Sequence, residues 1–219
     1  WFGITDGILG DYAFVASPNA DGDAGAIYVY HRTAPGTWTQ TQRITFMHGE
    51  IGATIRLHGT TLATSSPFYG PIPVVGRVFM YERNASGIYL QTAVLGATIA
   101  GDSQLFGFGM DFDGTTVLAV DRQAAQVETA TYAYAGGPSG SLTGGYIYRR
   151  SAVSGTAPGD AFGDGIAITG DGTVFIGAPR EATTGTNAGA VYAISPGHTV
   201  VLSDYGTPRT PQSYFGRAI

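Results

Sequence analysis

A hydrophobic residue followed by glycine recurs along this chain at intervals of roughly 50 residues, and this repeat is the feature that most restricts the possible folds. The five copies are Phe2-Gly3, Ile51-Gly52, Phe106-Gly107, Phe162-Gly163 and Phe215-Gly216. A repeat of this length is usually one supersecondary unit that stacks on its neighbours, because a single unit cannot bury its own apolar faces. We therefore expect four units with the boundaries 2–50, 51–105, 106–161 and 162–214, and the start of a further unit at 215–219.

Each unit carries two more segments that are typical of β-strands. A short apolar run lies at residues 12–18, 61–67, 116–121 and 173–179, and a strand that begins with glycine follows at residues 25–30, 76–81, 145–148 and 189–192. In such strands apolar and aromatic residues alternate, which gives each strand two faces for packing between neighbouring units. Turn residues that accept positive φ precede three of the apolar runs, at Gly59-Thr60, Asp113-Gly114 and Asp171-Gly172. The expected unit is a sheet of four antiparallel strands, here called A to D in chain order.

The order of these segments resembles the FG-GAP repeat family, whose units form β-propellers such as those of integrin α-subunits. The fourth unit is most similar, because Phe162-Gly163, Gly177-Ala178-Pro179 and Gly189-Ala190-Val191-Tyr192 follow one another in the family's order. The first unit adds residues 38–42 (WTQTQ), which are similar to an outer-strand segment of such repeats. The resemblance implies an all-β fold, a β-propeller of four-stranded antiparallel blades.

The number of blades is open at this point. Propellers have four to eight blades, and the resemblance favours seven, so that the four repeats seen here would be part of a larger ring. A compact four-bladed ring and an open array completed by other chains are the alternatives, and an open array would leave strand edges that need partners. Trp1 stands where an initiator methionine would be, so a processed or partial chain is expected.

The candidate binding residues lie in the loops between strands B and C. In a four-stranded meander these loops share one face with the D–A connections between units, here called the B–C face, and the A–B turns and C–D hairpins lie on the opposite face. The B–C connections are long, at residues 18–24, 68–75, 122–144 and 180–188, and long loops on a rigid scaffold commonly bind ligands. The longest one is expected to form an extra hairpin that displays Tyr132 and Tyr134, although it is alternatively an insertion without a ligand. In the third unit little room is left after Tyr148, so strand D is expected to be short or irregular.

Two further candidate sites involve single loops. Asn19, Asp21 and Asp23 have the alternating oxygen-ligand spacing of a calcium loop, but the same residues also form turns, and no distal Glu completes an EF-hand-like pattern. Integrin-type propellers carry calcium in an Asp-rich A–B loop, and the A–B turns here are too short for that. Asn84-Ala85-Ser86 is a sequon that would place a glycan on the C–D hairpin of the second unit, on the face opposite the B–C loops.

Composition excludes several classes of function. The chain has 11 Lys and Arg against 16 Asp and Glu, a net charge of −5, and no basic run, so nucleic acid is not an expected partner. No apolar segment reaches the roughly 20 residues that span a bilayer. The absence of cysteine excludes disulfides and thiolate chemistry. The histidines at 31, 48, 58 and 198 lie in different units without a catalytic motif, so the chain is not expected to be an enzyme and needs no cofactor beyond calcium.

These observations favour an extracellular or cell-surface adhesion module that binds a protein or a glycan through its B–C face. The main alternative is a structural protein whose blades self-assemble into a filament or surface layer. A weaker alternative is an accessory domain of a secreted hydrolase.

Overall fold

The computed structural model describes residues 2–46, 49–70, 75–96, 105–122, 129–135, 145–149, 159–183, 186–197, 199–204 and 212–219. These residues form an all-β protein with one short helix. The strands of the first two sheets are β1 (Asp6–Leu9), β2 (Tyr12–Ser17), β3 (Ala26–Ala34), β4 (Thr37–Thr45), β5 (Ile55–His58), β6 (Thr61–Ser66), β7 (Arg77–Arg83) and β8 (Tyr89–Leu95). The strands of the last two sheets are β9 (Met110–Phe112), β10 (Thr116–Arg122), β11 (Thr129–Ala135), β12 (Gly145–Arg149), β13 (Ile166–Ile168), β14 (Val174–Ala178), β15 (Ala190–Ile194) and β16 (Val200–Asp204).

The strands pair in chain order into four antiparallel sheets of four strands each, β1–β4, β5–β8, β9–β12 and β13–β16. The predicted all-β class and the four-stranded antiparallel unit are therefore confirmed. The predicted A–B turns are confirmed as well, because Gly59, Gly114 and Gly172 adopt φ values of 57°, 103° and 81°. The helix α1 (Ala20–Asp23) is a single turn in the B–C loop of the first sheet. No helix in the described part of the chain is long and apolar enough to cross a membrane.

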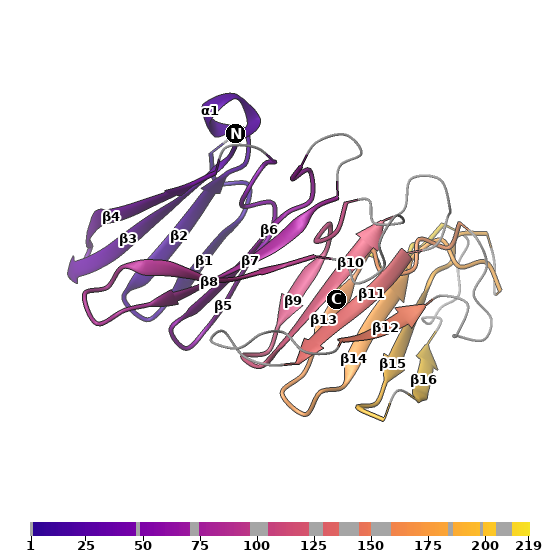
Figure 1. Ribbon diagram of the computed structural model, residues 1–219. Coiled ribbons are helices and arrows are strands. Elements are labelled where there is room, and N and C mark those ends of the chain that lie inside the picture. The colour runs from indigo at the N-terminus through magenta and orange to yellow at the C-terminus, as the bar shows by residue number, and fades with distance from the viewer. Residues whose placement is uncertain are drawn as a thin grey trace.

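The four sheets stack in a row through their first strands. Strand β1 contacts β5, β5 contacts β9, and β9 contacts β13. The first sheet and the fourth sheet lie at opposite ends of this row, so Figure 1 shows an open stack and not a closed ring of four. The loop with α1 lies at the top of this view, on the B–C face, and the A–B turns lie at the bottom.

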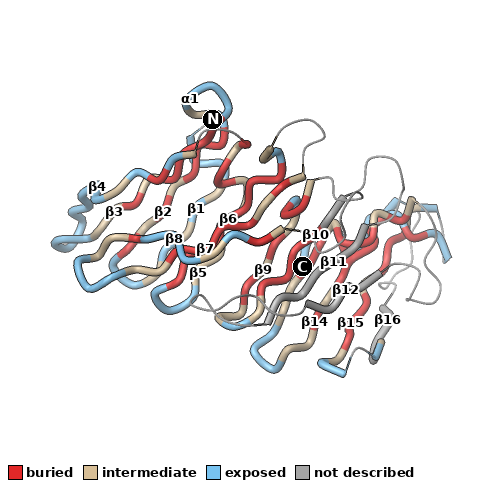
Figure 2. Tube along the Cα trace, viewed as in Figure 1, coloured by how far each residue is buried: buried red, intermediate tan, exposed pale blue. Residues whose placement is uncertain are grey.

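Three hydrophobic clusters lie between neighbouring sheets. The first includes Phe14 and Ile27 from the first sheet and Leu62 and Phe79 from the second, all of them at most 1% exposed. The other two clusters lie between the second and third sheets and between the third and fourth. Figure 2 shows these buried stretches crossing the middle of the strands, with exposed turns at the strand ends. Burying one such side chain contributes about 1.5–3 kcal/mol. Because these side chains are buried between sheets, each sheet is stabilised mainly by packing against its neighbours.

The hydrophobic-Gly pairs that begin at Ile51, Phe106 and Phe215 dock on the sheet that precedes them. Isolated parallel bridges join Gly25 to Ile51, Gly76 to Phe106 and Gly189 to Phe215. Ile51 and Phe106 are fully buried by this contact. Phe2 is 62% exposed and Phe215 is 36% exposed, because each lies at an end of the row.

The third sheet differs from the arrangement predicted from the sequence. Thr129–Ala135 pairs directly with β10 along its whole length, from Arg122 opposite Thr129 to Thr116 opposite Ala135, and is therefore strand C. Gly145–Arg149, which the glycine-led pattern predicted to be strand C, pairs with the outer edge of β11 and is strand D. The prediction of a long B–C loop at residues 122–144 was wrong. Strand D, which was predicted to be short or irregular and to follow Tyr148, is short but lies at Gly145–Arg149. The physical reason is that the longer alternating segment satisfies more of the backbone groups of β10 than the shorter glycine-led strand.

Candidate functional site

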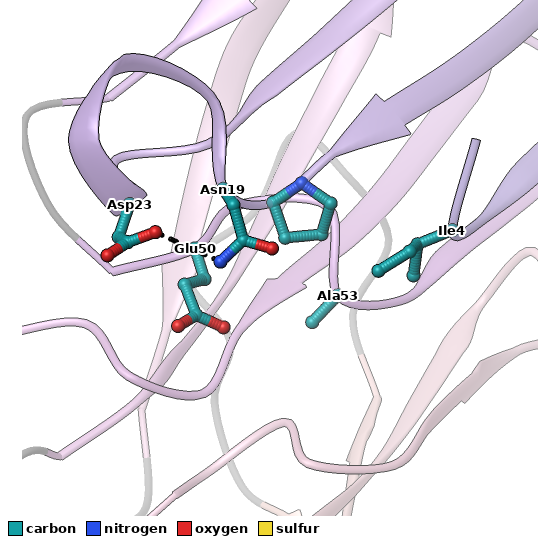
Figure 3. A pocket seen from close by; sticks show the side chains of 6 residues that line it. Ile4, Asn19, Asp23, Glu50 and Ala53 are labelled. Carbon is teal, nitrogen blue, oxygen red and sulfur yellow. Dashed lines mark hydrogen bonds between the residues drawn. The ribbon is translucent and has the colours of Figure 1, made fainter. Parts of the chain in front are cut away.

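A pocket of about 470 Å³ lies on the B–C face of the first sheet. It is lined by Ile4, Pro18, Asn19, Asp23, Glu50 and Ala53. Figure 3 shows Asn19, Asp23 and Glu50 grouped at one side of this pocket, and Ile4 and Ala53 at the other. The lining comes from three segments: the start of the first unit, its B–C loop, and the connection that begins the second unit.

A second pocket, of about 460 Å³, lies on the fourth sheet. It is lined by Asp164, Pro179, Arg180, Asn187, Tyr214 and Arg217. These six residues occupy the same positions of the repeat as the six of the first pocket. Ile4 and Asp164 are each the second residue after the hydrophobic residue that opens the unit, and a proline with its successor ends each apolar run. Asp23 and Asn187 each lie two residues before the docking glycine, which is the glycine bridged to the next unit (Gly25 or Gly189). The last two residues of each pocket flank the next hydrophobic-Gly pair. The two pockets, here called the first and fourth pockets, are therefore equivalent features of one repeat.

The same backbone geometry builds both pockets. The N–H of Glu50 donates to the carbonyl oxygen of Asp23 at 3.0 Å, and the N–H of Tyr214 donates to the carbonyl oxygen of Asn187 at 3.1 Å. All four of these residues have positive φ, at 57°, 68°, 50° and 53° respectively. Asp and Asn tolerate this left-handed conformation better than most residues, which accounts for their presence at 23 and 187.

The family comparison bears on the fourth sheet. Residues 152–194 match the family model of the FG-GAP repeat. This chain contains an FG-GAP repeat. The match confirms the resemblance predicted from Phe162-Gly163 and the segments that follow it. No curated protein matches the chain.

The FG-GAP match includes most of the fourth pocket. Asp164, Pro179, Arg180 and Asn187 lie inside the matched residues, and Tyr214 and Arg217 belong to the connection that follows. The pocket thus uses the B–C loop of one FG-GAP repeat together with the hydrophobic-Gly pair that comes after it. The first pocket has the same construction outside the matched segment.

The first pocket is acidic. Asp23 and Glu50 line it together, and no Lys or Arg is among its lining residues. Partial burial raises the pKa of Glu50 above its usual value, and the negative charge of Asp23 raises it further. Asn19 donates through Nδ2 to Oδ1 of Asp23 at 3.0 Å and holds that carboxylate toward the pocket.

The three residues predicted to bind calcium are separated by their contacts. The Asp21 carboxylate forms an ion pair with Arg43 of β4 at 2.6 Å, whereas Asn19 and Asp23 bond to each other. Among the described residues, no group of three or more His, Cys, Asp or Glu side chains is arranged to hold a metal ion. As arranged, the three side chains do not form a common ligand set, and calcium binding at this loop stays a prediction.

The fourth pocket carries the opposite charge. Arg180 and Arg217 both line it and both are exposed, and Asp164 is its one acidic lining residue. Sequence reasoning placed Arg180 and Asn187 in a candidate binding loop, but it missed Glu50 of the first pocket and Asp164, Tyr214 and Arg217 of the fourth. Aligning the repeats position by position finds them, because each occupies a fixed place relative to the docking glycine.

The other predicted residues lie away from both pockets. Tyr132 and Tyr134 belong to β11 and not to a loop hairpin, and a binding role for them stays a prediction. Asn84 is exposed on the hairpin between β7 and β8, where its Oδ1 accepts from the N–H groups of Ser86 and Ile88. Its glycosylation also stays a prediction.

The histidines give no sign of a shared site in the described residues. His31 stacks on Tyr12 with ring centroids 4.6 Å apart, and His58 contacts Phe112 in a different sheet. His48 and His198 lie outside the described residues. The expectation that the chain is not an enzyme therefore stays a prediction.

Proposed function

We propose that this chain is an extracellular or cell-surface binding module of the β-propeller type, which recognises a protein or a glycan through its B–C face. The observation that carries the proposal is the presence of two equivalent pockets, of about 470 and 460 Å³, at the same position of two repeats on one face. Both volumes lie in the range of small-ligand sites. The two pockets share a backbone frame and differ in side chains, which suits a scaffold whose loops vary its specificity.

The FG-GAP match supports the extracellular part of the proposal. FG-GAP repeats are typically found in extracellular or surface proteins. The open row of four sheets is also compatible with a larger ring, because both end sheets present faces that are buried by a neighbour elsewhere in the row. A seven-bladed propeller is part of the same proposal.

The test uses the absence of cysteine in the chain, which makes any introduced cysteine unique. Ala182→Cys places a thiol on the exposed B–C loop of the fourth sheet, and Ala85→Cys places one on the exposed β7–β8 hairpin of the opposite face. Each variant is coupled to a polyethylene glycol maleimide and applied to a glycan array and to intact cell surfaces. We expect the polymer at position 182 to abolish binding and the polymer at position 85 to leave it unchanged. Binding that is equally reduced by both, or no binding by the unmodified chain, would contradict the proposal.

A second candidate is self-assembly, which the end face of the first sheet favours. Ile4 and Ile8 are 47% and 70% exposed there, and Phe2 is 62% exposed. Ile8 occupies the repeat position of Leu57, which in the second sheet packs against the first hydrophobic cluster. An apolar face of this kind is normally covered, and a second copy of the chain offers the matching end face of its fourth sheet.

Light scattering during size exclusion tests this candidate across a concentration series. Assembly predicts that the apparent mass rises with concentration and that Ile8→Glu abolishes the rise. A monomer mass at every concentration would exclude self-assembly and leave the binding module as the remaining proposal. Leu90→Glu is the matched control, because Leu90 is also exposed, at 54%, but lies in the outer strand β8.

A further inference from the structure

The fourth pocket differs from its equivalent in charge and not in backbone. Positions 23 and 50 of the first pocket carry carboxylates, and the corresponding positions 187 and 214 of the fourth carry an amide and a phenol. Positions 19 and 53 carry an amide and a methyl group, and the corresponding positions 180 and 217 carry guanidinium groups. The two pockets have the same backbone geometry but opposite charge, which indicates that they select different ligands.

Backbone hydrogen bonds fix the positions of both arginines of the fourth pocket. The N–H of Arg180 donates to the carbonyl oxygen of Asp160 at 3.0 Å, and the N–H of Arg217 donates to the carbonyl oxygen of Tyr214 at 3.2 Å. Gly216, directly before Arg217, is buried against Gly177 so closely that a Cβ on Gly177 would lie 1.8 Å from the Gly216 carbonyl oxygen. Both side chains are exposed, and their attachment points are set by the docking of one repeat on the next.

We propose that the fourth pocket binds the carboxylate of an acidic sugar residue within a polysaccharide. This inference rests on the proposed binding function and names its ligand class. A guanidinium group pairs with a carboxylate through two parallel hydrogen bonds, and two such groups line one pocket of about 460 Å³.

The remaining lining residues favour a sugar over other anions. Tyr214 is 38% exposed in the pocket, and an aromatic ring packs favourably against the apolar side of a pyranose. Asn187 provides an amide donor and acceptor for hydroxyl groups. The Asp164 carboxylate adds a negative charge to the same pocket, which opposes a doubly charged phosphate more strongly than a singly charged carboxylate. A ring with hydroxyl groups and one carboxylate matches this combination.

The test compares an oligogalacturonate with the same oligomer after methyl esterification, by calorimetry with the full chain. Esterification removes the negative charge and leaves the sugar ring in place, so we expect the acid to bind and the ester to bind at least tenfold more weakly. Arg180→Gln combined with Arg217→Gln should weaken binding of the acid at least tenfold. Arg32→Gln, which removes an exposed arginine of β3 that lines neither pocket, is the matched control and should leave it unchanged. Melting curves of the variants verify folding, which two exposed arginines should not affect.

Several outcomes would overturn the inference. Equal binding of acid and ester, or acid binding that the double arginine variant does not change, excludes carboxylate recognition by these arginines. Tighter binding of a sulfated oligosaccharide assigns the pocket to sulfate, and binding of poly-glutamate alone assigns it to an acidic peptide. If polymer at position 182 abolishes binding on the array while oligogalacturonate does not bind, the inference fails and the proposed function stands. If neither experiment detects B–C face binding, both fail.

Discussion

Gly25 lies against Ile51 so closely that a Cβ atom at position 25 would be 2.5 Å from the Ile51 amide nitrogen. Gly76 and Gly189 repeat the contact, with a Cβ placed 2.3 Å and 2.2 Å from the carbonyl oxygens of Phe106 and Phe215. At these three positions the contact joins a sheet to the unit that follows it and sets the distance between the B–C loop and the following connection. The dimensions of the candidate pockets therefore depend on these glycines.

Gly25→Ala should destabilise the stack strongly. The residue has φ of 84°, and the added methyl group also meets backbone that cannot move away. Gly36→Ala is the matched control, because Gly36 has φ of 74° but nothing within 4 Å of its Cβ position. We expect about 1 kcal/mol from the left-handed conformation at position 36 and at least about 2 kcal/mol more at position 25. Urea unfolding measures both, and equal losses would show that the close approach is not rigid.

The hydrophobic residue of each pair should matter in proportion to its burial. Phe106 is fully buried between the second and third sheets, whereas Phe2 is 62% exposed and makes an edge contact with Tyr28. Phe106→Ala should reduce the free energy of unfolding by about 3–5 kcal/mol, and Phe2→Ala by less than about 1 kcal/mol. The same unfolding measurement applies. A loss at Phe2 as large as at Phe106 would mean that the exposed end is covered in solution, as self-assembly requires.

The carboxylate of Asp111 connects three sheets. Its Oδ1 accepts from Nε of Arg56 at 2.8 Å, and its Oδ2 accepts from the N–H of Ile168 at 2.9 Å. Asp111→Ala should cost about 2 kcal/mol, because it leaves the Ile168 N–H without its partner beside a half-exposed arginine. The comparison is Asp11→Ala, which breaks an ion pair whose partners are 55% and 47% exposed and should cost less than about 1 kcal/mol. Thermal melting measures both variants. Equal decreases in melting temperature would show that Asp111 stabilises the fold no more than an ordinary surface charge does.

Most of the fold could be predicted from the sequence because its signals are local or periodic. The hydrophobic-Gly pairs and the turn residues at Gly59, Gly114 and Gly172 are read from spacing and backbone preference alone. The third sheet could not be predicted in the same way, since residues 129–135 and 145–149 both alternate and only pairing with β10 decides between them.

The candidate pockets escaped prediction for a different reason. Asp23 and Glu50 belong to segments separated by β3 and β4, and they meet only after the second unit docks on the first. The contact of Gln42 could not be predicted from the sequence for the same reason. Its side chain forms hydrogen bonds with the N–H and the carbonyl oxygen of Tyr89 in the next sheet. Contacts between units carry no local sequence signal, and they become visible only when equivalent positions of the repeat are compared.

Calcium binding at Asn19, Asp21 and Asp23 requires Asp21 to leave Arg43. If the loop binds calcium, the ion should raise the melting temperature of the Arg43→Gln variant more than that of the unchanged chain, because the competing ion pair has been removed. The measurement is a melting curve with calcium and with a chelator for each protein. If neither protein melts at a different temperature with calcium than with chelator, the site is excluded.

Glu50 should make the stability of the first unit depend on pH. Burial and the charge of Asp23 raise its pKa, so the folded chain binds the proton more tightly than the unfolded chain. The stabilisation by that proton is complete below the unfolded pKa of about 4.3 and is lost as the pH rises through the higher folded pKa. Glu50→Gln removes the charged form, so the variant should melt at a higher temperature than the unchanged chain at pH 7, and this difference should shrink toward pH 4. A difference that is independent of pH would show that the amide acts by packing and that the carboxylate of Glu50 is not held in the acidic pocket.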